Sequence, residues 1–140
     1  MPIKVGTVGH FGITVHDPKK SARWWTATLN MKQRFSFPGG VVVGSEGVDI
    51  VLHKGTPRPE VLHHVSFHVA SKRALEQALA ELKRKKVALE DPGDEIGPEA
   101  EGSPNLGLWF RDPDGYRWEL SALVKPPRRR SKKNKNKRRG

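Results

Sequence analysis

The sequence predicts an α+β fold built from two similar βαβββ modules, and two internal echoes carry this prediction. Residues 10–17 (HFGITVHD) resemble residues 64–71 (HVSFHVAS), and residues 47–52 (GVDIVL) resemble residues 115–120 (GYRWEL). Both phrases of the first pair alternate as a strand does, and each ends at a residue that can cap a following helix. We therefore expect one supersecondary unit to occur twice.

The first module is expected to span about residues 7–54. Residues 9–15 alternate apolar with small or polar side chains, which predicts a strand with one buried face. Asp17 is a suitable N-cap and Pro18 suits the first helical position, so we predict a helix from 18 to about 29. Three short strands are expected next, separated by glycine-containing turns, at about 35–37, 41–43 and 48–52.

The second module is expected over about residues 61–123, after a proline-containing linker at 55–60. It restarts with an alternating strand at 62–69, and Ser71 can cap a helix from 72 to about 85. The remaining elements are a strand at 87–89, a long loop over 90–104, and a hairpin of strands 106–110 and 116–123 around the turn 112–115.

The charge of the chain is concentrated at its C-terminal end. The formal net charge is +11, but residues 125–140 hold 10 of the 26 Lys and Arg residues and no acidic residue. Residues 1–124 are therefore close to neutral, and we expect them to form a single domain followed by a disordered basic tail. Such a tail can neutralise phosphates, which predicts weak, non-specific binding of nucleic acid or other polyanions. A solvated appendage with no partner is the alternative.

The composition also limits the chemistry and the location of the protein. There is no cysteine, which excludes disulfides, thiolate metal sites and cysteine nucleophiles. The first residues lack the apolar core of a signal peptide, and no run approaches about 18 apolar residues. We expect a cytoplasmic protein with no membrane segment.

Three residues in the echoed phrases form a candidate metal-binding set. His10 and His64 open equivalent strands, and Glu119 lies near the end of the second module. Side chains alternate between the two faces of a strand, so all three should point away from the apolar residues that pack under the helices. Two imidazoles and one carboxylate are a facial ligand set that leaves open positions on a divalent metal.

With these residues in place, the chain resembles the vicinal oxygen chelate superfamily, the glyoxalase, bleomycin-resistance and extradiol dioxygenase fold. The resemblance covers residues 7–123 and is strongest in HVSFHV at 64–69 and FRDPDGYRWEL at 110–120. It implies a curved, open mixed sheet around a central cavity, with the helices on the outer face. It also implies a small-molecule substrate, and either pairing of the modules within one chain or a swap across a homodimer. The implied ligands are His10, His64 and Glu119, and the implied cofactor is Fe(II), Mn(II), Ni(II), Co(II) or Zn(II).

One position departs from the glyoxalase I-like members of that superfamily. They supply a further glutamate from the last strand of the first module, where this chain has Val51, which can neither ligate metal nor abstract a proton. We therefore expect a dioxygenase or a lyase/transferase that acts on a small oxygen-chelating substrate. The alternative is a metal-independent small-molecule binding or resistance protein of the bleomycin-resistance type.

Further residues are candidates for contact with a substrate. His53 follows Val51 by two positions and could act as a general acid or base, although a histidine at the rim of a strand is the alternative. By strand alternation, the side chains of Trp109 and Arg111 should face the cavity, where they suit a planar or anionic substrate. The alternative is that Arg111 pairs with an acidic residue near the hairpin turn. His63 should point away from His64, and we interpret it as structural or exposed.

Overall fold

The structure is a computed structural model that describes residues 2–90 and 95–123; the predicted tail at 125–140 lies outside the described residues. Two α-helices and two mixed, open β-sheets make up this described part, so the predicted α+β class is confirmed. Neither helix of this part is long and apolar enough to cross a membrane.

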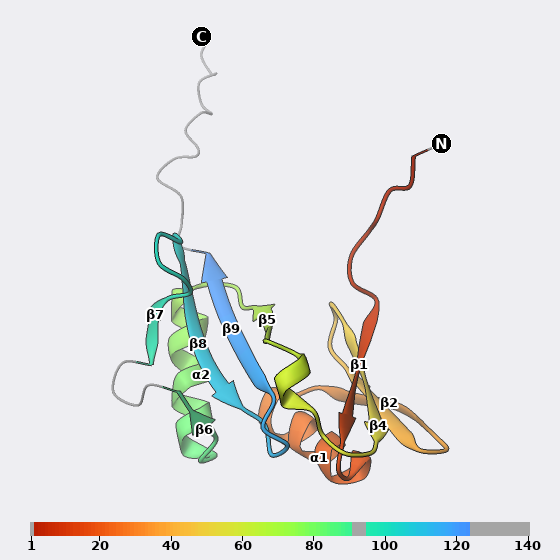
Figure 1. The fold of residues 1–140 in the computed structure, drawn as a ribbon. Helices are drawn as coiled ribbons and strands as arrows, with labels where there is room; N and C mark the ends of the chain where they lie inside the picture. The colour runs from red at the N-terminus through yellow and green to blue at the C-terminus, as the bar shows by residue number, and fades with distance from the viewer. Residues whose placement is uncertain (1, 91–94, 124–140) are drawn as a thin grey trace. The chain divides into compact units, whose positions relative to one another are not determined.

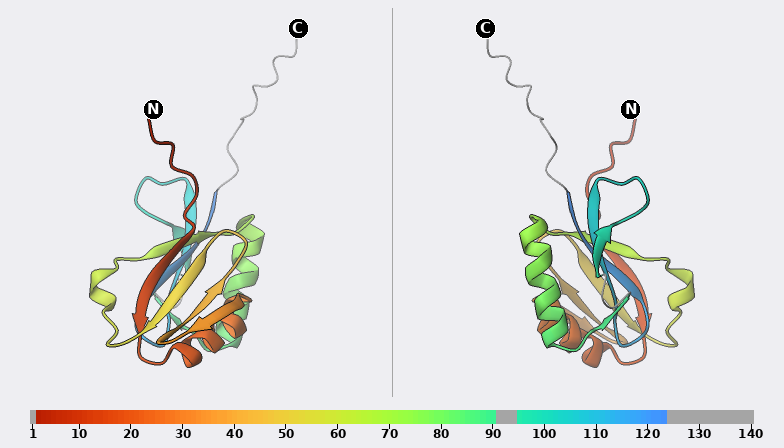
Figure 2. Two further views of the ribbon diagram at one scale, coloured as in Figure 1. Left: turned by 90° about the vertical axis from the view of Figure 1, so that its right-hand side faces the viewer. Right: turned by 90° about the vertical axis from the view of Figure 1, so that its left-hand side faces the viewer.

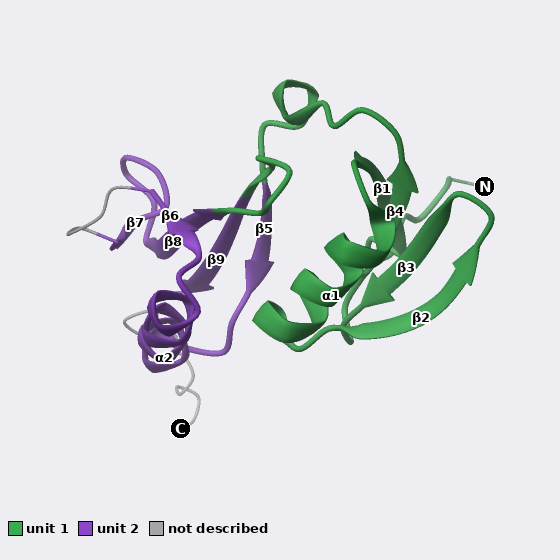
Figure 3. Cartoon of the chain, turned by 90° about the horizontal axis from the view of Figure 1, so that it is seen from below, with its two compact units in different colours: residues 1–64, 111–117 green, residues 65–110, 118–140 purple. Residues whose placement is uncertain are grey.

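The chain divides into two compact units, which Figure 3 shows in different colours. Of the described residues, unit 1 contains 2–64 and 111–117, and unit 2 contains 65–90, 95–110 and 118–123. The division does not follow the predicted modules throughout, because a short piece of the second repeat belongs to unit 1.

Unit 1 contains a four-stranded sheet in the order β1-β4-β3-β2, with β1 parallel to β4 and the other neighbours antiparallel. The helix α1 lies on one face of this sheet (Figure 3). The elements are β1 (His10–Val15), α1 (Pro18–Leu29), β2 (Lys32–Phe37), β3 (Gly40–Gly44), β4 (Asp49–Lys54) and the 3-10 helix η1 (Pro59–Val61).

The sequence explains where α1 begins and which face of the sheet it covers. The Asp17 carboxylate accepts a hydrogen bond from the backbone N–H of Lys20, so the predicted N-cap is confirmed. On the helix face of the sheet, Ile13 of β1 is paired with Leu52 of β4. Both are buried, as is Trp25 of α1, so apolar burial attaches the helix to this face.

Unit 2 repeats this plan, with the strand order β5-β9-β8-β6 and β7 paired to β8. β5 is parallel to β9, as β1 is to β4. Ser71 caps α2 by accepting from the backbone N–H of Ala74, and the helix buries Leu75 and Leu82. The elements, labelled in Figure 1, are β5 (Val65–His68), α2 (Lys72–Arg84), β6 (Ala88–Leu89), β7 (Ile96–Pro98), β8 (Asn105–Arg111) and β9 (Arg117–Leu123).

Two local predictions are corrected. The expected loop at 90–104 contains the strand β7, in which Gly97 pairs with Gly107 of β8; a glycine and a proline in three residues conceal the alternation of a strand. The strand expected at 62–69 begins only at Val65. Pro59 starts a 3-10 turn instead, which closes through the bond from the Leu62 N–H to the Pro59 carbonyl.

A buried tyrosine connects three distant segments of unit 1. The Tyr116 hydroxyl donates to the Thr14 carbonyl at 2.6 Å and accepts from the Arg58 N–H at 3.0 Å. Its own N–H donates to Oδ1 of Asp112, which also accepts from the Asp114 N–H. Strand β1, the linker before η1 and the turn at 112–115 are therefore held by one residue.

We predict that Tyr116→Phe destabilises the protein by about 1–3 kcal/mol, because the Thr14 carbonyl and the Arg58 N–H both lose their partner. Urea denaturation measures this change. The matched control is Glu60→Gln, which removes the exposed ion pair with Arg58 and should cost much less stability than Tyr116→Phe, because solvent screens the pair. Equal effects of the two variants would contradict the assignment.

Candidate functional site

The register of β1 and β4 determines which side chains share the face of unit 1 opposite α1. His10 opens β1 and is exposed. Gly12 is paired with Val51, and Thr14 with His53. Paired residues point to the same side of a sheet, so His53 lies on the face whose first residue is His10.

The parallel strand pairs of the two sheets, β1 with β4 and β5 with β9, have equivalent registers, but one of the equivalent positions holds a different kind of side chain in each sheet. Gly12 and Ser66 each follow their histidine by two positions in the sequence. In unit 1, Gly12 is paired with Val51, and in unit 2, Ser66 is paired with Glu119. The valine and the glutamate therefore occupy equivalent positions, as the alignment of the repeat predicted.

Glu119 has a position in β9 that suits a functional carboxylate. Its side chain is only 1% exposed. Its Oε2 lies so close to Gly107 of β8 that a Cβ at that position would collide with it. The space for the carboxylate thus depends on a glycine in the neighbouring strand, a requirement that the sequence analysis missed because no motif marks Gly107.

His64 lies in unit 1, between η1 and β5, and contacts its neighbour in the sequence. Its Nδ1 is 2.7 Å from Nδ1 of His63, and the two ring centroids are 4.8 Å apart. The expectation that His63 points away from His64 was wrong. It assumed a strand from 62 onward, whereas strand alternation starts only at Val65.

His53 borders a hollow of about 400 Å³ in unit 1, which we call the His53 hollow. Arg58, Val61 and Leu62, from the segment around η1, line one side of it. Figure 2 shows the ribbon of this segment beside β1. The imidazole lies over Gly12, where an added Cβ would be 3.2 Å from Nε2, and the ring of Phe37 contacts it edge to face at 5.7 Å. The lining residues are Gly12, Ile13, Thr14, His53, Arg58, Val61, Leu62 and Tyr116.

Arg58 is the cationic residue of this hollow and is not among the residues predicted from the sequence. Its guanidinium donates to Glu60 at 2.6 Å. This hydrogen bond lowers the pKa of Glu60 and raises the pKa of Arg58, so both groups keep their charge near neutral pH. A proline-containing linker offers no periodic pattern that would have indicated its place.

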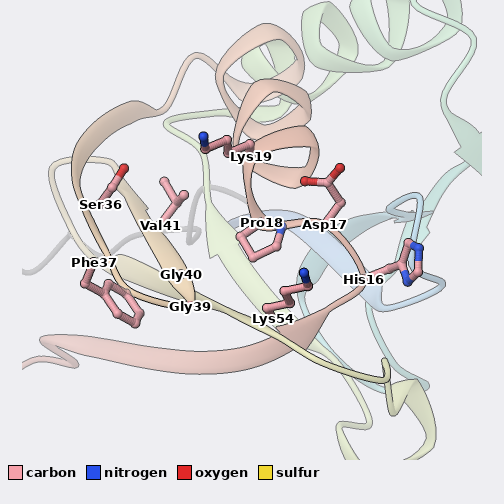
Figure 4. Close-up of a pocket in the computed structure, with 10 residues that line it drawn as sticks. All are labelled: His16, Asp17, Pro18, Lys19, Ser36, Phe37, Gly39, Gly40, Val41 and Lys54. Atoms are coloured by element: carbon pink, nitrogen blue, oxygen red, sulfur yellow. The ribbon is translucent and has the colours of Figure 1, made fainter.

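A second cavity of unit 1, of about 450 Å³, lies on the helix side of the sheet. Figure 4 shows it between the start of α1, at Asp17 and Pro18, and the β2–β3 turn at Gly39. None of its lining residues is a predicted ligand, acid/base group or substrate contact. We therefore regard the His53 hollow as the candidate site of unit 1.

The two residues predicted to bind substrate belong to different units. Trp109 of β8, in unit 2, is half-buried between the buried Leu108 and Phe110, in agreement with the expected alternation. Arg111, in unit 1, is exposed and donates from Nη1 to the Gly115 carbonyl at 3.0 Å. This bond ties Arg111 to the hairpin turn.

The chemistry of the predicted ligands fits a divalent metal. Imidazole nitrogens and a carboxylate suit Zn(II), Fe(II) and the related ions. His10 and His64 belong to unit 1 and Glu119 to unit 2. Among the described residues, no three His, Cys, Asp or Glu side chains are gathered closely enough to hold a metal.

Solved structures similar to this chain support the fold. A glyoxalase/bleomycin resistance protein/dioxygenase from Nocardioides has a TM-score of 0.71 at 16% identity, over 89% of this chain and 87% of that one. The fosfomycin resistance protein FosX from Listeria monocytogenes has a TM-score of 0.70 at 18% identity, over 87% of this chain and 97% of that one. An integron cassette protein from the V. cholerae mobile metagenome has a TM-score of 0.67 at 21% identity, over 89% of this chain and 100% of that one. At these identities the likeness shows the fold alone.

The sequence comparison extends this result from fold to family. No curated protein matches the chain. The sequence model of one family, however, matches residues 7–120, which is most of the chain and includes His10, His64 and Glu119. The protein thus belongs to the Glyoxalase/Bleomycin resistance protein/Dioxygenase superfamily.

Proposed function

We propose that the protein is a cytoplasmic, divalent-metal-dependent enzyme, a dioxygenase or a lyase/transferase, that acts on a small oxygen-chelating substrate. His10, His64 and Glu119 bind the metal, which is Fe(II), Mn(II), Ni(II), Co(II) or Zn(II). Membership of the superfamily and the chemistry of this ligand set support the proposal.

The observation that carries the proposal is the difference between two equivalent register positions. Ser66 is paired with Glu119, whereas Gly12 is paired with Val51. These two equivalent positions therefore hold one carboxylate, whereas a fully symmetric repeat would have two or none. Two imidazoles and this carboxylate would hold a metal through three ligands and would leave its other positions to a substrate, because the apolar Val51 cannot act as a fourth ligand.

The proposed site residues of each unit have separate roles. A bound divalent cation supplies Lewis-acid chemistry toward two neighbouring oxygens of a substrate. Gly107 keeps the space that the Glu119 carboxylate occupies. His53 accepts or donates a proton at its Nε2, and Phe37 orients its ring. The Arg58 guanidinium favours an anionic group in the hollow of unit 1. In unit 2, the half-buried Trp109 favours a planar substrate.

Removal of one proposed ligand should abolish tight metal binding. We predict that His10→Ala, His64→Ala and Glu119→Gln each weaken Zn(II) binding by at least about 100-fold. This is more than the loss of a residue that only hydrogen-bonds to a ligand would cause. Competition with a chromogenic chelator measures the affinity. For the wild-type protein, metal at about 100 times its Kd should add about 2.7 kcal/mol of stability.

The exposed His16, whose side chain lies outside the proposed ligand set, provides the matched control. His16→Ala should keep the wild-type affinity. A wild-type melting temperature that none of the five metals changes would refute the metal-dependent enzyme. It would favour the metal-independent binding protein instead.

Two probe reactions separate the candidate activities. With Fe(II) and catechol, a ring-cleaving dioxygenase consumes oxygen, which an oxygen electrode records. With Mn(II), fosfomycin and a small thiol, addition of the thiol or of water opens the epoxide: a C–S or C–O bond forms, one ring C–O bond breaks, and the released oxygen takes up a proton. The product shifts the phosphonate signal in ³¹P NMR without oxygen uptake. Metal-loaded protein that converts neither probe would favour the binding protein.

In whichever reaction proceeds, we predict that His53→Gln lowers kcat by about 10²–10⁴-fold, because it removes the acid/base group. The metal affinity of this variant should equal that of the wild type. The neighbouring Lys54→Gln, whose side chain lines the other cavity, is the control and should keep kcat. An unchanged kcat in His53→Gln would show that the histidine only belongs to the rim.

We also propose that residues 125–140, which lie outside the described residues, bind nucleic acid weakly and without sequence preference. The segment has ten cationic side chains and no acidic one, whereas residues 1–124 are nearly neutral. It contains no aromatic or aliphatic side chain that would insert into a bilayer, so the phosphates of a nucleic acid are the favoured partner.

Binding of the chain to a single-stranded DNA should weaken steeply with salt. The slope of log K against log salt should approach about −7 if all ten cations contact phosphates. Deletion of residues 125–140 should remove the binding, as measured by fluorescence anisotropy. Binding that survives the deletion, or that occurs only to anionic lipid vesicles, would contradict this partner.

A further inference from the structure

We infer that His63 is a positioning residue for the proposed metal ligand His64. In this arrangement Nδ1 of His63 accepts the hydrogen carried by Nδ1 of His64, which leaves Nε2 of His64 as the metal-binding atom. The inference rests on the proposed function for the identity of the ligand, and on the contact between the two rings for its geometry.

The contact is between two ring nitrogens of the same kind. The Nδ1 atoms are 2.7 Å apart, and the rings meet edge to face at 67°. A hydrogen bond at this distance requires that one nitrogen carries the hydrogen and that the other presents a lone pair. There are two such arrangements, and they differ in the nitrogen that His64 has available.

Only one arrangement permits His64 to bind a metal. If His63 donated, the Nδ1 lone pair of a neutral His64 would be used, and its Nε2 would carry the hydrogen. No lone pair would then remain for the metal. If His64 donates, its Nε2 lone pair is available, and its second nitrogen is bonded in the way that is usual for histidine ligands of metals.

The local backbone makes this contact possible. Successive residues of a strand point to opposite faces, so adjacent histidines within β5 could not bring their rings together. His63 and His64 instead lie in the short connection between η1, which ends at Val61, and β5, which starts at Val65. The 3-10 turn thus places an acceptor beside the ligand.

The experiment compares three forms of the full chain: the wild type, His63→Ala and His63→Asn. The asparagine carries an acceptor oxygen on Cγ, in nearly the place of the histidine Nδ1, whereas alanine has none. His63→Ala should raise the Kd for Zn(II) by about 10–100-fold, the loss typical of an outer partner. His63→Asn should largely restore the wild-type Kd, and His16→Ala should not change it.

The second measurement needs no metal. Long-range ¹H–¹⁵N NMR of metal-free protein reports which nitrogen of His64 carries the hydrogen. The wild type and His63→Asn should show a hydrogen on Nδ1, and His63→Ala should shift the population toward a hydrogen on Nε2. A wild-type His64 with its hydrogen on Nε2, or equal Zn(II) affinity in wild type and His63→Ala, would overturn the inference.

These outcomes are distinct from failure of the proposed function. If His64→Ala binds Zn(II) as tightly as the wild type, His64 is not a ligand and the proposed function fails. The tautomer measurement then still decides whether His63 holds the Nδ1 hydrogen of its neighbour. If His64→Ala loses the metal and His63→Ala does not, the function stands and the positioning role of His63 falls.

Discussion

The arrangement of unit 1 depends on the two hydrogen bonds of the Tyr116 hydroxyl. The hydroxyl connects the Thr14 carbonyl in β1 with the Arg58 N–H in the linker, while Asp112 holds the backbone of Tyr116. The turn that carries Tyr116 has Gly115 at a φ of 90°, which favours glycine. Because these segments are distant in the sequence, one side chain determines which of them border the His53 hollow.

The paired registers impose the second constraint, because they place different side chains at equivalent positions of the two sheets. A strand places every second side chain on one face, so the register defines the position paired with Gly12 in one sheet and the position paired with Ser66 in the other. Val51 occupies the first of these positions and Glu119 the second. The hollow with His53 lies in unit 1 and the buried carboxylate in unit 2.

The parts that were predictable from the sequence are those where local patterns and burial agree. The caps Asp17 and Ser71, both helices and the hairpin strands follow from capping chemistry and from the period of the apolar residues. The parts that failed have weak local patterns. The strand β7 contains a glycine and a proline, and the start of β5 was displaced by the 3-10 turn at Pro59.

By itself the sequence determined the duplicated βαβββ plan, the common face of His10 and His53, and the equivalence of Val51 with Glu119. Each of these follows from alternation along a strand, which is a local property. Only the tertiary structure decided that Gly107 makes room for Glu119, that Tyr116 and Arg58 border the hollow with His53, and that His63 meets His64. These contacts join different strands, or lie where the chain leaves regular structure, and no periodic pattern encodes them.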